Sequence, residues 1–321
     1  MTGAPIRIGR RLSDESALLR LYGAGDENLD RLEHVLGVEI FSRGDQLDVL
    51  GDRDRVNLAW SAIDLLQARA RAGEHLIPAD VDAAVRMCGE DHLPVLSIRT
   101  RKGEIRPRSP GQARYIQAMK DAELVFGLGP AGTGKTYLAV AMGVSLFLSR
   151  KVERLVLSRP AVEAGERIGF LPGDMREKVD PYLRPMYDAL HATLPGEEVV
   201  RKLESGEFEV APLAFMRGRT LSNAFIILDE AQNTTASQMK MFLTRLGENS
   251  RMVITGDPSQ IDLPGGVKSG LRDALDVLKD EDAIRTIHFT DRDVVRHDLV
   301  ARIVRAYDRR DADKEKIPNA G

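Results

Sequence analysis

The chain has 321 residues, of which 43% are hydrophobic and 30% are charged, a composition typical of a globular protein with two domains. Its formal net charge of -3 excludes a strongly basic surface over the whole protein, so any nucleic-acid site must be local. Cys88 is the single cysteine, which excludes an internal disulfide, and no Cys/His cluster indicates zinc. A small, partly buried Cys88 in a reducing cytoplasm fits this composition.

Membrane and export signals are not evident in the sequence. The first residues lack a charged segment followed by a long apolar stretch, so they do not resemble a signal peptide. The longest nearly apolar run, residues 137–148, is too short to cross a bilayer. We therefore expect a cytoplasmic protein with no membrane partner.

The chain divides into four predicted sections. Residues 5–87 form a small α/β domain, and residues 88–111 form a basic linker or hairpin. Residues 112–307 form a large second domain, and residues 308–321 are polar and predicted to be disordered.

The small domain is predicted to contain two helices and two strands. Apolar residues recur at helical spacing in residues 27–36, where Gly37 ends the helix, and in residues 56–66. Residues 38–41 and 46–50 form short strands joined by an Arg-Gly-Asp turn.

The large domain alternates apolar strands with helices. Five short apolar runs are each bounded by turn residues, at 124–128, 154–158, 225–229, 252–256 and 285–289. Continuous apolar strands between helices predict a parallel sheet covered on both faces, which places the chain in the α/β class.

A phosphate-binding loop is predicted between the first of these strands and an apolar helix. Its sequence matches the P-loop pattern G-x-x-x-x-G-K-[ST] in full. The eight residues are Gly129, Pro130, Ala131, Gly132, Thr133, Gly134, Lys135 and Thr136. The glycines let backbone N–H groups surround the β-phosphate, and the helix N-terminus adds its positive end. Lys135 is expected to contact the β- and γ-phosphates of ATP, and Thr136 to bind Mg²⁺.

Acidic and amide residues follow two later strands. Asp229 ends an apolar strand and is expected to hold Mg²⁺ as a Walker-B acid, while strand alternation directs Glu230 away from Asp229, toward the water that attacks the γ-phosphate. Gln260 follows the strand at 252–256 and is expected to sense the γ-phosphate, although Asp257-Pro as a plain turn remains an alternative. The position of Glu230 next to Asp229 disfavours a nucleotide kinase.

Longer strings resemble one family. Residues 229–235 (DEAQNTT) and 256–260 (GDPSQ) are similar to motifs II and III of superfamily 1 helicases. The strings that resemble PhoH family proteins are residues 158–166, 169–174, 178–185, 215–220, 229–235, 238–247 and 293–297. The resemblance covers residues 105–307 densely and the small domain more loosely. It implies an ATPase with a RecA-like, helicase-like core, linked to phosphate starvation and RNA metabolism.

The same resemblance suggests partners and an adenine contact. The family branch with an N-terminal KH-like domain is associated with a YbeY-type endoribonuclease. Gln112 is similar to the helicase Q-motif glutamine that reads adenine, with a surface linker glutamine as the alternative.

Single-stranded RNA has three candidate sites outside the P-loop. The small domain resembles a KH fold, but its GXXG loop would be Gly23-Ala-Gly-Asp26, and residues 1–90 carry a net charge of -5, so a protein contact is as plausible as RNA. Residues 99–114 carry a net charge of +5, which suits phosphates or simply a solvated hairpin. Arg159 corresponds to the nucleic-acid-contacting loop after the second strand of superfamily 1 enzymes.

The chain has room for one RecA-like lobe, whereas superfamily 1 helicases have two. The γ-phosphate would then need an arginine from a neighbouring copy, so we expect a homo-oligomeric ring, with six copies as the expected number. Arg245 leads the candidate fingers because it lies off the apolar stripe of residues 236–247; a surface ion pair is the alternative for each. The other candidates are Arg217, Arg219 and Arg296.

Two functions follow from these expectations. The first is an ATPase that remodels RNA in a helicase-like way. The second is a nucleotide-gated scaffold that docks an endoribonuclease without motor activity.

Overall fold

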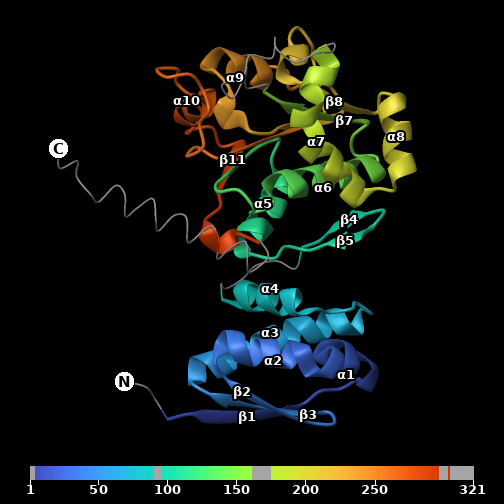
Figure 1. Ribbon diagram of the computed structural model, residues 1–321, viewed down its shortest axis with the longest axis vertical. Coiled ribbons are helices and arrows are strands. Elements are labelled where there is room, and N and C mark those ends of the chain that lie inside the picture. Colours follow the sequence, from blue (N-terminus) through green and yellow to red (C-terminus); the bar gives the residue numbers. More distant parts are fainter. Residues whose placement is uncertain (1–3, 90–95, 161–174, 296–302, 304–321) are drawn as a thin grey trace, which may run out of the picture.

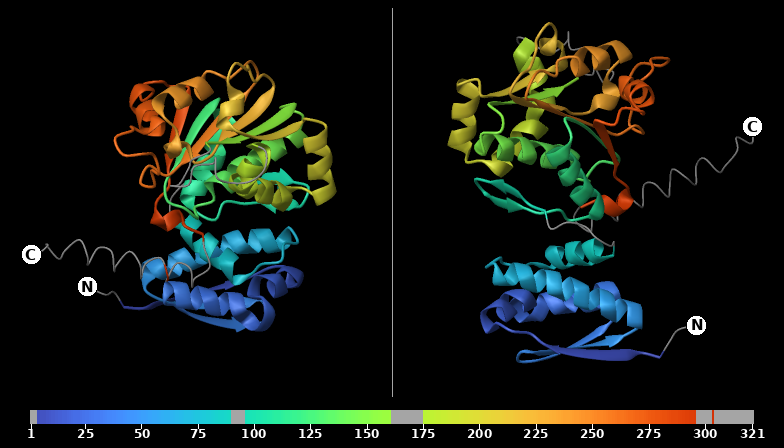
Figure 2. Two further views of the ribbon diagram at one scale, coloured as in Figure 1. Left: turned by 45° about the horizontal axis from the view of Figure 1, so that its top comes forward. Right: turned by 180° about the vertical axis from the view of Figure 1, so that it is seen from behind.

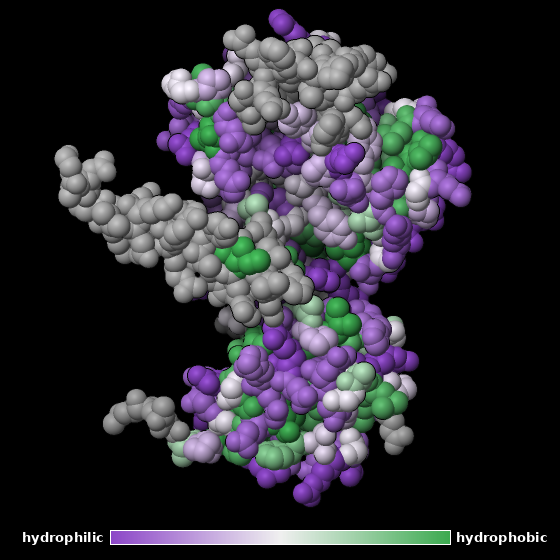
Figure 3. Space-filling model, in the orientation of Figure 1, coloured by the Kyte–Doolittle hydropathy of each residue, from purple (hydrophilic) through white to green (hydrophobic). Residues whose placement is uncertain are grey.

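The computed structural model describes residues 4–89, 96–160, 175–295 and 303. The predicted tail at 308–321 lies outside this part of the chain. Two units lie one above the other in Figure 1, and the space-filling view narrows between them in Figure 3. No helix within the described residues is long and apolar enough to span a membrane.

The N-terminal unit is a three-stranded antiparallel sheet with helices on one face (Figure 1). Its strands lie in the order β1-β3-β2, and Trp60, Leu47 and Val49 are buried in the core between sheet and helices. The elements in chain order are β1 (Ile6–Arg11), α1 (Glu15–Tyr22), α2 (Glu27–Leu36), β2 (Glu39–Arg43), β3 (Gln46–Gly51), α3 (Arg53–Arg71) and α4 (Pro78–Cys88).

Four elements of this unit match the sequence predictions, and three were missed. Gly37 ends α2 with a left-handed φ of 62°, as the prediction required. The strand β1 was missed because only Ile6 and Ile8 alternate before three basic or glycine positions follow. The 8-residue helix α1 was also missed, as was α4, whose buried residues are mainly alanines. The segment Ala24–Asp26 between α1 and α2 is a single 3₁₀ turn.

A short antiparallel hairpin connects the two units. It consists of β4 (Ile98–Thr100) and β5 (Gly103–Ile105). The buried side chain of Ile98 packs into the core of the large unit, and α4 lies on the other side of the hairpin (Figures 1 and 2).

The large unit is a six-stranded parallel sheet with helices on both faces, which confirms the α/β prediction. The strand order is β11-β6-β10-β9-β7-β8, and every neighbouring pair is parallel. The strands are β6 (Leu124–Leu128), β7 (Arg154–Arg159), β8 (Phe208–Pro212), β9 (Ala224–Leu228), β10 (Arg251–Gly256) and β11 (Ile284–His288). The edge strand β8 was missed because its Phe-Glu-Val-Ala-Pro sequence is partly polar.

Alternate side chains of each central strand enter two separate cores. On β9, Phe225 and Ile227 pack with α5 (Pro110–Asp121), α6 (Lys135–Leu148) and α7 (Met175–Thr193). Ile226 and Leu228 pack on the other face with α9 (Ala236–Leu243) and α10 (Gly270–Val277). The helix α8 (Gly196–Glu204) covers the β8 edge of the first face. Two filled faces hold the carboxyl ends of the strands in one fixed row.

Candidate functional site

The predicted site residues gather at the carboxyl edge of the sheet. The loop between β6 and α6, the end of β9 and the end of β10 line one cavity of about 480 Å³. This strand order places β6, β10 and β9 side by side, so residues as far apart in the chain as Thr136 and Asp229 meet there. The side chains and backbone of α7 close the opposite wall.

The P-loop has the backbone that its sequence predicts. Gly129, Gly132 and Gly134 have φ values of 140°, 85° and 84°, which residues other than glycine rarely adopt. A Cβ at Gly129 would lie 2.5 Å from the carbonyl oxygen of Phe289, so this position has no room for one. Lys135 is 9% exposed, and its Nζ donates to the carbonyl oxygens of Gly129 and Pro130 at 2.7 and 2.8 Å.

Asp229 joins the P-loop helix to the two central strands. Its Oδ1 accepts hydrogen bonds from Thr136 Oγ1 at 2.7 Å and from Thr255 Oγ1 at 2.6 Å. Its backbone N–H donates to the carbonyl of Ser158 on β7 at 2.9 Å. Burial, together with the nearby charge of Asp229, raises the pKa of Tyr115 well above its ordinary value.

Glu230 lies in the same cavity but not for the reason expected from strand alternation. The strand β9 ends at Leu228, and Glu230 has a left-handed φ of 52°. This turn, rather than a strand, directs the side chain toward the cavity. Its Oε1 forms an ion pair with Arg159 at 3.0 Å, and its Oε2 accepts from Gln232 Nε2 at 2.5 Å. A left-handed glutamate is strained, which is common at functional sites.

Gln260 and Asp257 complete the edge of the cavity. Gln260 Nε2 donates to Asp257 Oδ2 at 2.8 Å, and both residues line the cavity with Lys135. Asp257 Oδ1 also accepts from the backbone N–H of Ser259, so the Asp-Pro segment is a turn that carries a site residue. Gln232 Oε1 accepts from the backbone N–H of Asp257 at 3.0 Å and thus links the Glu230 turn to this segment.

The donor set fits a nucleoside triphosphate with Mg²⁺. Mg²⁺ is usually held by one or two protein oxygens plus phosphates and water. Thr136 and Asp229 supply such a pair, and among the described residues no group of three His, Cys, Asp or Glu forms a metal site made by protein alone. The P-loop amides at the start of α6 and Lys135 supply the positive surroundings that phosphates require.

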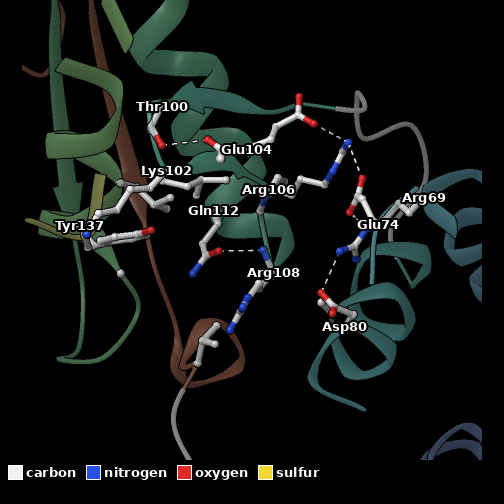
Figure 4. Close-up of a pocket in the computed structure, with 18 of the residues that line it drawn as sticks. Arg69, Glu74, Asp80, Thr100, Lys102, Glu104, Arg106, Arg108, Gln112 and Tyr137 are labelled. Carbon is white, nitrogen blue, oxygen red and sulfur yellow. Dashed lines mark hydrogen bonds and ion pairs between the residues drawn. The ribbon is translucent and has the colours of Figure 1, made fainter. Parts of the chain in front are cut away.

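A second cavity of about 660 Å³ adjoins the first (Figure 4). Gly132, Gly134, Tyr137 and Ala192 line both cavities, so a ligand bound at the P-loop can extend from one into the other. The hairpin and the N-terminal unit form the far wall, with Arg69, Glu74, Asp80 and Ala83 among its residues.

Gln112 lines the second cavity and forms a hydrogen bond to the P-loop. It is 5% exposed, its Nε2 donates to the carbonyl of Thr133 at 2.9 Å, and its Oε1 accepts from the backbone N–H of Arg108 at 2.7 Å. It is therefore a buried residue rather than a surface linker residue, and its side-chain amide is bonded at both ends to backbone.

A line of hydrogen bonds continues from Gln112 into the N-terminal unit. The carbonyl of Arg108 accepts from Arg86 Nε of α4 at 3.0 Å. Nearby, Arg106 bridges Glu74 of the N-terminal unit and Glu104 of the hairpin, each at 2.7 Å (Figure 4). Three side-chain hydrogen bonds thus connect the P-loop to the N-terminal unit. Gln112 donates one and accepts one, and Arg86 donates the third.

The candidate fingers differ in their surroundings. Arg245 Nε and Nη1 donate to the carbonyls of Met241 and Arg219, and Arg219 forms a double contact with Glu209 at 2.6 and 2.7 Å. Arg217 is exposed, and no hydrogen bond or ion pair of its side chain is found within the described part of the chain. Arg296 lies outside the described residues.

The sequence did not indicate the active-site contact of Arg159. It predicted a nucleic-acid contact there, but Arg159 Nη2 holds Glu230 and Nη1 donates to the carbonyl of Tyr182 at 2.9 Å. The adjacency of β7 and β9, which brings the two residues together, could not be read from the chain order. Strings at 161–174 and 296–297 that supported the resemblance lie outside the described residues.

Replacement of Gln112 by Ala tests this buried connection. The loss of one side chain leaves the Thr133 carbonyl and the Arg108 N–H without these partners, a cost of about 1–3 kcal/mol. We expect about tenfold weaker binding of a fluorescent nucleoside triphosphate to Gln112→Ala. The matched control is Gln117→Ala on the same helix, whose amide bonds only Asp121 and which should bind as the wild type does. Equal affinity of all three proteins would contradict the role of Gln112.

Comparison with known proteins assigns the chain to a family. The family model for PhoH-like protein matches residues 104–308. The PhoH-like protein of Bacillus subtilis (strain 168) is 48% identical over 317 residues, which cover 96% of this chain and 99% of that protein. The PhoH-like protein of Mycobacterium tuberculosis (strain ATCC 25618 / H37Rv) is 52% identical over 296 residues, 90% of this chain and 84% of that protein.

The solved structures give only distant matches. A large terminase from a thermophilic bacteriophage has a TM-score of 0.35 and 16% identity, over 61% of this chain and 49% of that chain. This similarity is too low to support a conclusion about function. The family model covers well over half of the chain, and relatives near 50% identity cover almost all of it. The chain, with its P-loop nucleotide site, therefore belongs to the family of PhoH-like proteins.

Proposed function

We propose that this chain hydrolyses ATP and uses the reaction to remodel single-stranded RNA. The observation that carries the first half is a single cavity that contains Lys135, the Thr136–Asp229 pair and Glu230. A site that only bound nucleotide would not need a carboxylate held beside the metal pair by an arginine and a glutamine.

Hydrolysis needs an activated water molecule. Glu230 would accept a proton from water while the water oxygen bonds to the γ-phosphorus and the bond from that phosphorus to the β–γ bridging oxygen breaks. Each Glu230 oxygen accepts one contact in this structure, from Arg159 or from Gln232, so its second lone pair is left to accept from water. Mg²⁺, held by Thr136 and Asp229, would supply neutralisation of the triphosphate charge.

The replacement Glu230→Gln tests the catalytic role. It retains the shape and the ability to bond but cannot accept the proton, so we expect kcat to fall by about 10²–10⁴-fold with little change in ATP affinity. The control Lys135→Ala should instead lose ATP binding, because it removes the phosphate contact. Phosphate release and nucleotide binding are measured on the same preparations. Wild-type turnover in Glu230→Gln would exclude Glu230 as the base.

A ring of identical chains is the second part of the proposal. One sheet with one P-loop leaves the γ-phosphate open on the side where a second lobe would supply an arginine, and such a finger contributes about 10³–10⁵ in rate. Arg217 is the candidate we favour, because Arg245 and Arg219 are already bonded within their own chain while Arg217 is exposed. We propose a closed ring, six copies being the expected number.

Mixing two inactive variants tests a finger supplied by the neighbouring chain. Lys135→Ala lacks ATP binding and Arg217→Ala lacks the finger, so each should hydrolyse ATP at least about 1000-fold more slowly than wild type, the low end of a finger's contribution. In mixed rings, about one quarter of the interfaces pair an intact P-loop with an intact Arg217, so activity should return. A mixture of Lys135→Ala and Glu230→Gln is the control and should stay inactive, because both residues act in the same cavity. No recovery in the first mixture would contradict the proposal for Arg217.

A second candidate function is a nucleotide-gated scaffold for an endoribonuclease of the YbeY type. The hydrogen bonds that run from Thr133 through Gln112 and Arg108 to Arg86 favour it, because they give nucleotide at the P-loop a direct connection to the N-terminal unit. On this proposal the N-terminal unit is KH-like but contacts protein. Its net charge of -5 over residues 1–90 supports protein over RNA there.

The scaffold proposal predicts binding that depends on nucleotide. A YbeY-type endoribonuclease immobilised on a sensor should bind this protein at least tenfold more tightly in one nucleotide state, ADP or a non-hydrolysable ATP analogue, than in the other. Arg86→Ala should reduce that difference, because it breaks the last hydrogen bond of the line. The exposed Arg53 supplies the matched control, Arg53→Ala. Equal affinity in both states would rule this function out.

A further inference from the structure

A groove rich in basic residues lies at the edge of the sheet opposite the P-loop. It has a volume of about 620 Å³ and lies between the hairpin and the C-terminal end of α6. The start of β10 and the end of α5 form its remaining wall. We call this cavity the basic groove; its five cationic residues are Arg99, Arg101, Lys120, Lys151 and Arg251.

Positive charge dominates the basic groove. No Asp or Glu is among the described residues that line it. Arg99, Lys120 and Lys151 are exposed, and none of the three forms an ion pair with another described residue. Arg101 makes a long contact of 3.8 Å with Glu198, which leaves most of its charge to the solvent.

Arg251 is held in place at the groove wall. Its Nη1 donates to the carbonyl of Met119 at 2.8 Å and also to the carbonyl of Lys120, in the last turn of α5. These two contacts hold the guanidinium group of Arg251 in place. No carboxylate among the described lining residues neutralises its charge. The arrangement concentrates positive charge on a fixed wall.

The cations come from four separate segments, so the fold and not one basic run creates the groove. Of the six basic residues between 99 and 114, only Arg99 and Arg101 line it. Lys102, Arg106 and Arg108 line the nucleotide-side cavity instead. Thr100 lines both, so the hairpin is the wall between the two cavities.

We propose that the basic groove binds the backbone of single-stranded RNA. This inference rests on the RNA half of the proposed function and gives that RNA a site. The hydroxyls of Ser97, Ser145 and Ser149 line the groove together with the cations. Cations and hydroxyl donors suit a chain that has one phosphate per nucleotide.

An acidic protein segment fits the groove less well. Such a segment carries its charges on flexible side chains, whereas RNA carries one charge on every unit of its backbone. No aromatic side chain is among the described lining residues, so base stacking contributes little and phosphate contacts carry the affinity. Binding should therefore depend steeply on salt and weakly on base identity.

The test compares two triple variants of the full-length protein. Arg99→Gln/Lys120→Gln/Lys151→Gln removes three groove charges. The control, Arg53→Gln/Lys240→Gln/Lys279→Gln, removes the same residue types from exposed positions outside the groove. Binding of fluorescein-labelled oligouridylate is measured by anisotropy over a range of salt concentrations, with melting temperatures recorded to verify folding.

The groove variant should show a smaller salt dependence. Each phosphate contact on a single strand contributes about 0.7 to the slope of log K against log salt, so the slope should fall by about 2. That change corresponds to about 100-fold weaker binding at about 0.1 M salt, whereas the control should bind as the wild type does. The wild type should bind oligoadenylate and oligouridylate about equally.

Three results would overturn the inference. If the groove variant retained the wild-type affinity and slope, the RNA site would lie elsewhere while the proposed function stood. If polyglutamate displaced the RNA as effectively as unlabelled RNA, an acidic protein segment would be the better occupant. If the wild type bound no RNA, both this inference and the RNA half of the proposed function would fail, while the Glu230→Gln result would still decide ATP hydrolysis.

Discussion

The shared carboxylate of Asp229 is the contact on which the nucleotide site depends. One oxygen accepts from Thr136 at the start of α6 and from Thr255 on β10, while the backbone of Asp229 bonds to β7. The P-loop is therefore attached to the middle of the sheet and not merely to its own helix. Because β6, β10 and β9 are adjacent and buried on both faces, the position of this carboxylate is set by the two hydrophobic cores.

The sequence predicted the parts of the site that short motifs define. The P-loop, Asp229 and Gln260 could be recognised because each follows an apolar strand and has a chemistry linked to its spacing. The Arg159–Glu230 pair could not, because it depends on which strands are neighbours and on a left-handed turn that no residue type demands. The elements β1, α1 and β8 escaped prediction because their apolar pattern covers few residues, and α4 did so because two of its three buried residues are alanines.

The structure adds most to the linker. The sequence predicted a basic linker or hairpin there, and the structure shows a hairpin that separates two cavities and divides its cations between them. Gln112 joins the same segment to the P-loop, and Arg106 joins it to the N-terminal unit. The described contacts between the two units thus include polar ones beside the nucleotide site.

Gly143 allows the P-loop helix to lie very close to the sheet. It lies within α6, where a Cβ would come within 2.5 Å of Leu155 and 2.7 Å of Phe225, so the helix rests directly on β7 and β9 at this point. One end of α6 carries Lys135, and the other, about 21 Å away by helix geometry, borders the basic groove. A side chain at position 143 would push α6 away from β7 and β9, and would therefore displace the P-loop end and the groove end of the helix together.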